Sequence, residues 1–246
     1  MWGAMKQVFL ALTLAGALMA QTKDAPKSDG TKAPARSTAP QTPAPTKGNI
    51  LEPATLNATA PAMFRAKLTT TKGDIVIEVT RAWAPRGADR FYNLVRSGFF
   101  SDIAFFRVLP GFMAQFGISG RPEVARVWQN ANIQDDPVKQ SNARGKVTFA
   151  TAGPNTRSTQ FFINFGNNAQ LDGQGFSPFG EVVEGMATVV DKIYSGYGET
   201  PDQGRIQSQG NTYLKANYPM LDRIISAAIV AMPPAAAPAA APAATK

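Results

Sequence analysis

The chain has 246 residues, 44% of them hydrophobic, with no cysteine and no histidine, so disulfides, thiolate nucleophiles, Ser-His-Asp catalysis and zinc sites built on Cys or His are excluded. The formal net charge is +8, yet residues 50–245 carry 18 Lys or Arg against 15 Asp or Glu, which places most of the excess at the ends and argues against specific nucleic-acid binding. The length favours one substantial domain with appended segments.

The N-terminus has the pattern of a secretory signal peptide over residues 1–20. Lys6 precedes an apolar run from Val8 to Met19, which is shorter than the ~20 residues of a membrane-spanning helix. Cleavage is expected after Ala17, with Ala20 as the alternative site. No cysteine follows the run, so a lipid anchor is excluded. We therefore expect an exported protein, either periplasmic or secreted.

Two segments have a composition that cannot form a core. Residues 21–61 are rich in Pro, Ala, Thr and Lys, and residues 232–246 are rich in Ala and Pro. Both are predicted to be disordered because they contain too few apolar side chains to offset the loss of chain entropy. The folded domain is then expected to occupy residues 62–231.

Short strands and turns fill this domain. Residues 64–71 and 74–80 alternate in character around Lys72-Gly73 and predict a hairpin. Helices are predicted over 85–97 and over 186–194, where apolar residues recur at helical spacing. Residues 117–145 and 195–222 are expected to be long polar connections. Six more strands are expected near 103–109, 112–116, 146–151, 160–165, 178–183 and 223–230.

Eight short antiparallel strands and two helices favour a mainly β fold, a closed eight-stranded barrel whose ends the helices cover. Within it, period-two alternation places Phe105, Arg107 and Leu109 on one face of a strand. The turn at Pro110-Gly111 brings Phe112 and Gln115 close to that strand. An arginine among aromatic residues is often only a surface side chain with its stem on apolar neighbours. This strand alone therefore does not decide between such a surface arginine and a functional arginine that lines an apolar groove.

A series of further blocks, in order and spacing, resembles the cyclophilin-type peptidyl-prolyl isomerases over roughly residues 64–230. The blocks are Phe-x-Arg-Val at 105–108, Pro-Gly-Phe-Met-x-Gln at 110–115, Ala-x-Ala-Gly-Pro-Asn-Thr at 150–156, Gln-Phe-Phe-Ile at 160–163, Leu-Asp-Gly at 171–173 and Phe-Gly-Glu-Val-Val-Glu-Gly-Met at 179–186. The resemblance implies that Arg107 is the catalytic residue. It implies that the substrate-binding residues are Phe112, Met113, Gln115, Ala150, Thr151, Ala152, Gln160, Phe162, Gln170, Leu171 and Phe176.

Some positions depart from the family pattern. Phe106 stands where many members have histidine, Gln170 where the best-known members have tryptophan, and Phe176 where they have another histidine. Phe116 and Ile118 replace the usual Gly and Asp. None of these changes affects the arginine, so the resemblance still implies isomerase activity. Binding of cyclosporin-like inhibitors is expected to be weaker than in members that carry the tryptophan.

The implied reaction is rotation about X–Pro peptide bonds, without a metal or any other cofactor. The expected partners are unfolded or partly folded exported proteins, and the protein is expected to act as a monomer. The competing hypothesis is a cyclophilin-like binding module or chaperone that holds Pro-containing segments without turnover. Arg107 and Gln115 favour the enzyme, because an arginine donor can stabilise the twisted amide of the transition state.

Overall fold

The structure is a computed structural model that describes residues 48–233, so the predicted signal peptide, residues 21–47 of the predicted linker and most of the C-terminal tail lie outside the described residues. None of the helices within that range is long and apolar enough to span a membrane. In chain order the elements are η1 (Pro53–Thr55), β1 (Met63–Thr70), β2 (Gly73–Thr80), α1 (Pro85–Arg96), β3 (Ile103–Ala104), β4 (Arg107–Leu109), β5 (Met113–Phe116), α2 (Pro122–Trp128), β6 (Lys146–Phe149), β7 (Phe161–Asn164), η2 (Ala169–Gln174), β8 (Pro178–Glu184), η3 (Val190–Lys192), α3 (Gln203–Asn217) and β9 (Arg223–Val230).

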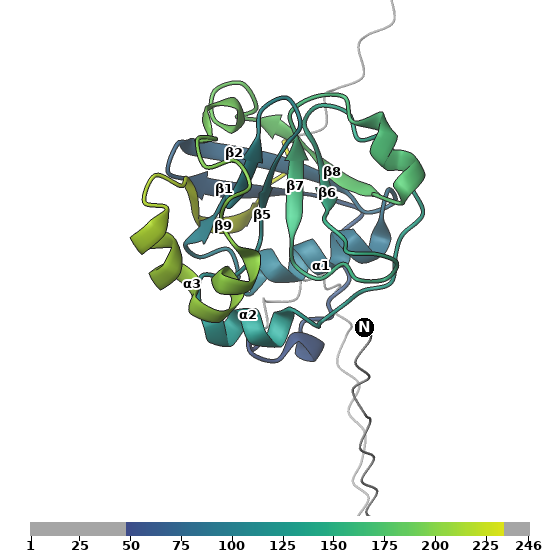
Figure 1. The fold of residues 1–246 in the computed structure, drawn as a ribbon. Coiled ribbons are helices and arrows are strands. Elements are labelled where there is room, and N and C mark those ends of the chain that lie inside the picture. Colours follow the sequence, from purple (N-terminus) through teal and green to yellow (C-terminus); the bar gives the residue numbers. More distant parts are fainter. Residues whose placement is uncertain (1–47, 234–246) are drawn as a thin grey trace, which may run out of the picture. The chain divides into compact units, whose positions relative to one another are not determined.

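The nine strands form one strongly curled antiparallel sheet in the order β3-β9-β1-β2-β8-β6-β7-β5-β4 (Figure 1). The two strands at the ends of this order, β3 and β4, are separated in the chain only by Phe105 and Phe106. The mainly β, antiparallel prediction is confirmed. The closed eight-stranded barrel is not, because the sheet has nine strands and its hydrogen-bonded order ends at β3 and β4.

The break between β3 and β4 also corrects the predicted alternation. Ala104 pairs with β9, whereas Arg107 pairs with β5, so the chain changes partner at Phe105 and Phe106. The side chain of Phe105 is therefore fully buried in the main core and does not share the face of Arg107. Alternation holds within a paired strand, but it does not continue across a change of pairing partner.

The hairpin of β1 and β2 forms as predicted. Thr70 lies opposite Gly73, and Gly73 adopts a φ of +123° that a residue with a side chain rarely takes. Along β1 every second residue, beginning with Phe64, is buried, which gives the strand one face toward the core.

Aromatic rings fill the core that the curled sheet encloses. Phe161 contacts Phe149 with a centroid separation of 4.4 Å and Phe91 with one of 5.4 Å. Phe91 belongs to α1, which confirms the predicted first helix and anchors it on the core. The N-terminus of α1 is fixed by Asp136, whose carboxylate accepts hydrogen bonds from the backbone N–H groups of Arg86 and Gly87 at 3.1 and 2.9 Å.

The predicted second helix over 186–194 is wrong. The chain there forms turns and the single 3-10 turn η3, after Gly185 at a φ of +89°. The other α-helices, α2 and α3, lie instead in the two connections that were expected to be irregular, and they pack together at one side of the sheet (Figure 1).

The expected disordered linker also needs correction, because residues 48–61 pack against the domain. The Trp128 indole Nε1 donates to the Ile50 carbonyl at 2.7 Å, and the Asn93 amide exchanges two hydrogen bonds with the backbone of Ala58. Ala60 is buried, and its N–H donates to Asp89. Backbone contacts supply what the composition lacks, so the packed part of the chain begins near residue 48 and not at 62.

Candidate functional site

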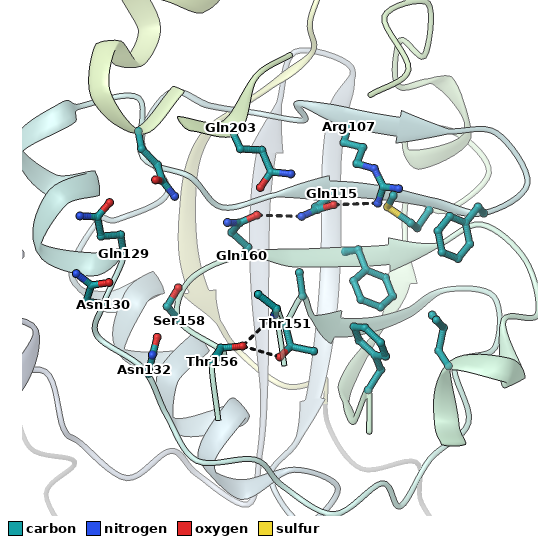
Figure 2. A pocket seen from close by; sticks show the side chains of 18 residues that line it. Arg107, Gln115, Gln129, Asn130, Asn132, Thr151, Thr156, Ser158, Gln160 and Gln203 are labelled. Atoms are coloured by element: carbon teal, nitrogen blue, oxygen red, sulfur yellow. Dashed lines mark hydrogen bonds between the residues drawn. The ribbon is translucent and has the colours of Figure 1, made fainter. Parts of the chain in front are cut away.

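A cavity of 590 Å³ opens beside β4, β5 and β7 and is bounded on its far side by Gln129, directly after α2, and by Gln203 of α3 (Figure 2). It brings together every predicted site residue except Gln170. The lining residues are Arg107, Phe112, Met113, Gln115, Gln129, Asn130, Asn132, Ala150, Thr151, Ala152, Thr156, Ser158, Gln160, Phe162, Leu171, Phe176, Gln203 and Gln207.

Strand register places the central residues of the cavity in one row. Arg107 lies directly opposite Gln115 in the β4–β5 pair, and Gln115 lies opposite Phe162 in the β5–β7 pair. Residues directly opposite in an antiparallel sheet point to the same face. On β5 and β7 the intervening residues, such as Ala114 and Ile163, point to the core, so each strand has a core face and a cavity face.

Hydrogen bonds connect the polar members of this row. The Arg107 Nη1 donates to Gln115 Oε1 at 3.3 Å, and Gln115 Nε2 donates to Gln160 Oε1 at 2.9 Å (Figure 2). Gln115 is 7% exposed, so its amide has little freedom to reorient. Donor and acceptor ends therefore alternate along the chain of three side chains, and the arginine is held by its Nη1 edge.

An apolar hollow lies at one end of the cavity, next to the arginine. Met113, Phe162 and Leu171 form a buried cluster there, and Phe176 closes one side with its ring 5.9 Å from that of Phe162. Phe112 packs against the same cluster. The hollow is lined by side chains without hydrogen-bonding groups, which suits a small apolar ring such as the pyrrolidine of proline.

The opposite end of the cavity is polar and uncharged. Figure 2 shows Gln129, Asn130 and Asn132 on the side of the cavity away from Arg107, with Ser158 between them and Gln160. Gln203 and Gln207 of α3 complete this part of the lining. Sequence reasoning missed these residues, because scattered Gln and Asn in a polar connection have no distinctive spacing. Their amides can donate to and accept from the backbone of an extended peptide.

Close backbone contact holds α2 and α3 together and so shapes this polar end. Asn211 N–H donates to the Gly120 carbonyl at 2.8 Å, where α3 is interrupted by Gly210 at a φ of +58°. A Cβ on Gly210 would lie 2.1 Å from the Gly120 oxygen. Glycine is required here by both conformation and space.

Arg90 stabilises the backbone at the polar end of the cavity. It donates to the carbonyls of Ala131 and Ser158 at 2.5 and 3.1 Å and stacks on Trp128. Burial, with the nearby charge of Arg157, lowers the pKa of Arg90 to about 10. The group stays protonated near neutral pH, so these hydrogen bonds persist there.

The loop of residues 150–156 forms one rim of the cavity. Thr156 Oγ1 accepts from the Ala152 N–H at 2.9 Å and lies 2.8 Å from Thr151 Oγ1. Ala150 N–H donates to the Gln160 carbonyl at 3.0 Å. The small side chains of Ala150 and Ala152 leave the rim low, so an extended chain can approach it.

Gln170 is the predicted site residue that the structure does not bring to the cavity. It lies in η2 with an exposed side chain, while its neighbour Leu171 turns inward.

Asp172, the residue after Leu171, holds η2 in place. Burial opposes ionisation of Asp172, but hydrogen bonds from Ser141 and Asn142 outweigh it and lower the pKa of Asp172. This carboxylate anchors η2 and with it the inward position of Leu171.

The family departures at Phe106 and Phe116 lie away from the cavity. Phe116 is buried in the main core, and Phe106 packs in a separate cluster with residues of α3. Among the described residues that line the cavity, Arg107 is the one charged side chain. Across residues 48–233, no group of three or more acidic side chains is arranged to hold a metal ion.

Comparison with known proteins gives one consistent family. The family model "Cyclophilin type peptidyl-prolyl cis-trans isomerase/CLD" matches residues 65–211. The chain is similar to "Peptidyl-prolyl cis-trans isomerase-like 1" of Gibberella zeae, at 34% identity over 50% of this chain and 76% of that protein. It is also similar to "Probable peptidyl-prolyl cis-trans isomerase" of Brucella abortus (strain 2308), at 38% identity over 50% of this chain and 68% of that protein.

Solved structures support the fold. A cyclophilin type peptidyl-prolyl cis-trans isomerase of Cryptosporidium parvum aligns with a TM-score of 0.53 and 21% identity, over 70% of this chain and 99% of that one. The same protein crystallised in the presence of the dipeptide Ala-Pro aligns with a TM-score of 0.52, over 68% of this chain and 99% of that one. The family model covers more than half of the chain and agrees with the site geometry. The chain belongs to the cyclophilin-type peptidyl-prolyl cis-trans isomerase family.

Proposed function

We propose that this protein catalyses cis–trans rotation about X–Pro bonds in extended peptide segments, with Arg107 as the catalytic residue. The observation that carries the proposal is the position of a single guanidinium beside an apolar hollow. Arg107 lines the same cavity as Met113 and Phe162, and its Nη1 is oriented by Gln115. A proline ring in the hollow would place its amide nitrogen near the guanidinium.

The physics of the amide bond explains why this arrangement is enough. Rotation about the bond is opposed by about 18–20 kcal/mol because the nitrogen shares its lone pair with the carbonyl. In the twisted state the nitrogen regains a lone pair that can accept a hydrogen bond. A fixed donor above that nitrogen binds the twisted state better than either planar state, and each ~1.4 kcal/mol of this difference accelerates rotation about tenfold. Arginine suits the task because it stays protonated and its donors form a rigid fork.

The remaining predicted residues take binding roles in this proposal. Phe112, Met113, Phe162, Leu171 and Phe176 hold the proline ring. Gln115 and Gln160 offer polar groups to the substrate backbone in the middle of the cavity. The peptide passes the low rim at Ala150, Thr151 and Ala152 and continues along the amide-lined end. Gln170, exposed outside the cavity, has no direct role.

The proposed biological setting is outside the cytoplasm. Support comes from the N-terminal pattern of Lys6 and the apolar run from Val8 to Met19. Substrates would be exported proteins that fold slowly at X–Pro bonds, since uncatalysed isomerisation takes tens to hundreds of seconds. Appearance of the full chain in the periplasm or medium, and its retention inside the cell when residues 2–20 are deleted, would support export. Retention of the full chain inside the cell would contradict it.

Weak cyclosporin binding is a further part of the proposal. Gln170 stands at the position that resembles the family's tryptophan, and its exposed side chain supplies neither an indole donor nor apolar area to the cavity. Calorimetric titration would give a dissociation constant well above that of a tryptophan-containing member measured in parallel. An equal constant would contradict this point.

An isomerase assay on a short X–Pro peptide tests the function. We expect the protein to accelerate isomerisation and Arg107→Ala to lower kcat/KM at least about tenfold at unchanged melting temperature. Arg65→Ala is the matched control, because Arg65 is also a strand arginine paired with a glutamate but does not line the cavity. No activity in the wild type, with peptide binding retained, would instead indicate a binding module.

A further inference from the structure

Two side chains contact the Arg107 guanidinium at different edges. One is Gln115, and the other, Glu199, comes from a distant part of the chain. Arg107 Nε and Nη2 both lie 3.0 Å from Glu199 Oε2, while Nη1 donates to Gln115. Glu199 stands 92 residues further along, outside every block that resembles the family. It does not line the cavity itself.

Backbone hydrogen bonds fix the loop that carries Glu199. The Gly198 carbonyl accepts from the N–H of Val108 at 3.0 Å, so the loop is joined to the residue that directly follows Arg107. On the other side of Glu199, the Thr200 carbonyl accepts from the Tyr218 hydroxyl at 3.0 Å. The two neighbours of Glu199 are therefore both tied down, and the distance between its backbone and β4 is set by the fold.

A cluster of tyrosine rings supports the same loop. Tyr197 packs edge-on between Tyr194 and Tyr218, with centroid separations of 5.1 and 5.0 Å. The Tyr213 hydroxyl accepts from the Asp202 N–H at 3.1 Å, at the start of α3. Aromatic pairs of this kind stabilise beyond the area they bury. Ring packing and hydrogen bonds thus hold the loop that carries Glu199 in a defined position.

We infer that Glu199 is a positioning residue for Arg107, an inference that rests on the catalytic role of Arg107 proposed above. A free arginine side chain loses rotamer entropy when it is fixed in one conformation. Glu199 and Gln115 fix the guanidinium before substrate arrives, so the transition state does not have to order it.

The geometry argues for positioning and against blocking. A guanidinium has five N–H donors, and the contacts to Glu199 and Gln115 use three of them. Two donors remain for the substrate. The carboxylate occupies the Nε edge, whereas the Nη1 edge beside Gln115 faces the row of cavity residues. Glu199 therefore restrains the arginine without taking the position that the twisted amide needs.

The test compares Glu199→Ala and Glu199→Gln with Glu184→Ala. Glu184 is the matched control because its side chain is equally exposed, 65% against 64%, and also pairs with an arginine, Arg65, away from the cavity. We expect Glu199→Ala to lower kcat about two- to fivefold, in keeping with a solvent-exposed ion pair, with KM and melting temperature unchanged. Glu184→Ala should behave as the wild type.

Salt provides a readout that a merely structural role would not change. Raising NaCl from 0.1 to 1 M shortens the screening length from about 10 to about 3 Å. Turnover of an uncharged peptide by the wild type should fall toward the level of Glu199→Ala. Glu199→Gln, which keeps a hydrogen-bond acceptor but no charge, should be intermediate and insensitive to salt.

Two results would overturn the inference. The first is a kcat for Glu199→Ala equal to or above the wild type, which would make the carboxylate neutral or inhibitory. The second is an equal salt response in the wild type and Glu199→Gln. Arg107→Ala, measured in the same series, distinguishes failure of the positioning role of Glu199 from failure of the catalytic role of Arg107. Loss of activity in Arg107→Ala with no effect of Glu199→Ala refutes only the positioning role, whereas full activity of Arg107→Ala refutes the proposed mechanism.

Discussion

Arg107 and Gln115 lie directly opposite each other on β4 and β5, and the arginine Nη1 donates to the glutamine Oε1 at 3.3 Å. The turn between the two strands therefore does more than reverse the chain. It sets the register that brings the one charged side chain of the cavity lining, as far as the described residues show, onto a buried amide. Phe112 and Met113, in and after that turn, enter the apolar hollow at the same time.

Gln115→Ala tests the importance of this contact. The substitution removes the restraint at the Nη1 edge and leaves Gln160 without its donor. We expect kcat to fall about three- to tenfold, less than in Arg107→Ala, because Glu199 still holds the other edge. The melting temperature should fall only slightly, since one hydrogen bond contributes about 1 kcal/mol. The control is Gln209→Ala, because Gln209 of α3 is exposed and does not line the cavity. Turnover of Gln115→Ala equal to that of this control would contradict the role of Gln115.

Truncation tests the packing of residues 48–61. A chain that starts at residue 62 loses the hydrogen bonds from Trp128 to Ile50 and between Asn93 and Ala58. We expect its melting temperature, measured by calorimetry, to fall by about 5 °C or more. The control is a chain that starts at residue 48, which should melt like one that starts at residue 21. Equal melting temperatures for the chains starting at 48 and at 62 would show that the segment adds no stability.

Asp102 gives the fold a dependence on acid. Burial opposes its ionisation, but hydrogen bonds from Arg223 and Lys215 outweigh that effect and hold the pKa of Asp102 below its ordinary value. A carboxylate with a lower pKa in the folded state binds fewer protons there than in the unfolded chain. Its stabilisation is therefore complete above about pH 4 and is lost as the pH falls through the folded pKa.

Asp102→Asn isolates this effect. Asparagine tolerates the φ of +53° at this position, so the substitution changes the charge without straining the backbone. We expect the variant to melt below the wild type at pH 7, with a difference that shrinks as the pH is lowered from 5 to 3. Glu184→Gln serves as the exposed control. A difference that stays constant with pH would mean that the carboxylate charge is not what stabilises the fold.

Much of the fold and the site could be predicted because the relevant residues are close in sequence or lie on well-patterned strands. Arg107 and Gln115 share one hairpin, and Phe162 lies on a strand whose side chains point alternately to the core and to the cavity, so local rules place them correctly. The cavity's amide-lined end escaped prediction, because Gln129 and Gln203 come together only through the packing of α2 on α3.

The errors in helix placement have a physical cause. Residues 186–194 show apolar spacing, but valines and a preceding glycine at positive φ favour a short turn there. The helix α3 contains Gly204 and Gly210 and buries few apolar residues, so its sequence reads as a polar loop. Its packing depends on the close contact with Gly120 that Gly210 allows. Such tertiary stabilisation leaves little trace in sequence periodicity.

Exchange NMR on a peptide with one X–Pro bond tests the central claim most directly, because it reports binding and rotation in the same sample. The wild type should shift the peptide resonances and produce cis–trans exchange cross-peaks on the timescale of turnover. Arg107→Ala should still shift the resonances, since the apolar hollow is intact, but should slow the exchange at least about tenfold. Exchange at the wild-type rate in Arg107→Ala would contradict the assignment of catalysis to this arginine.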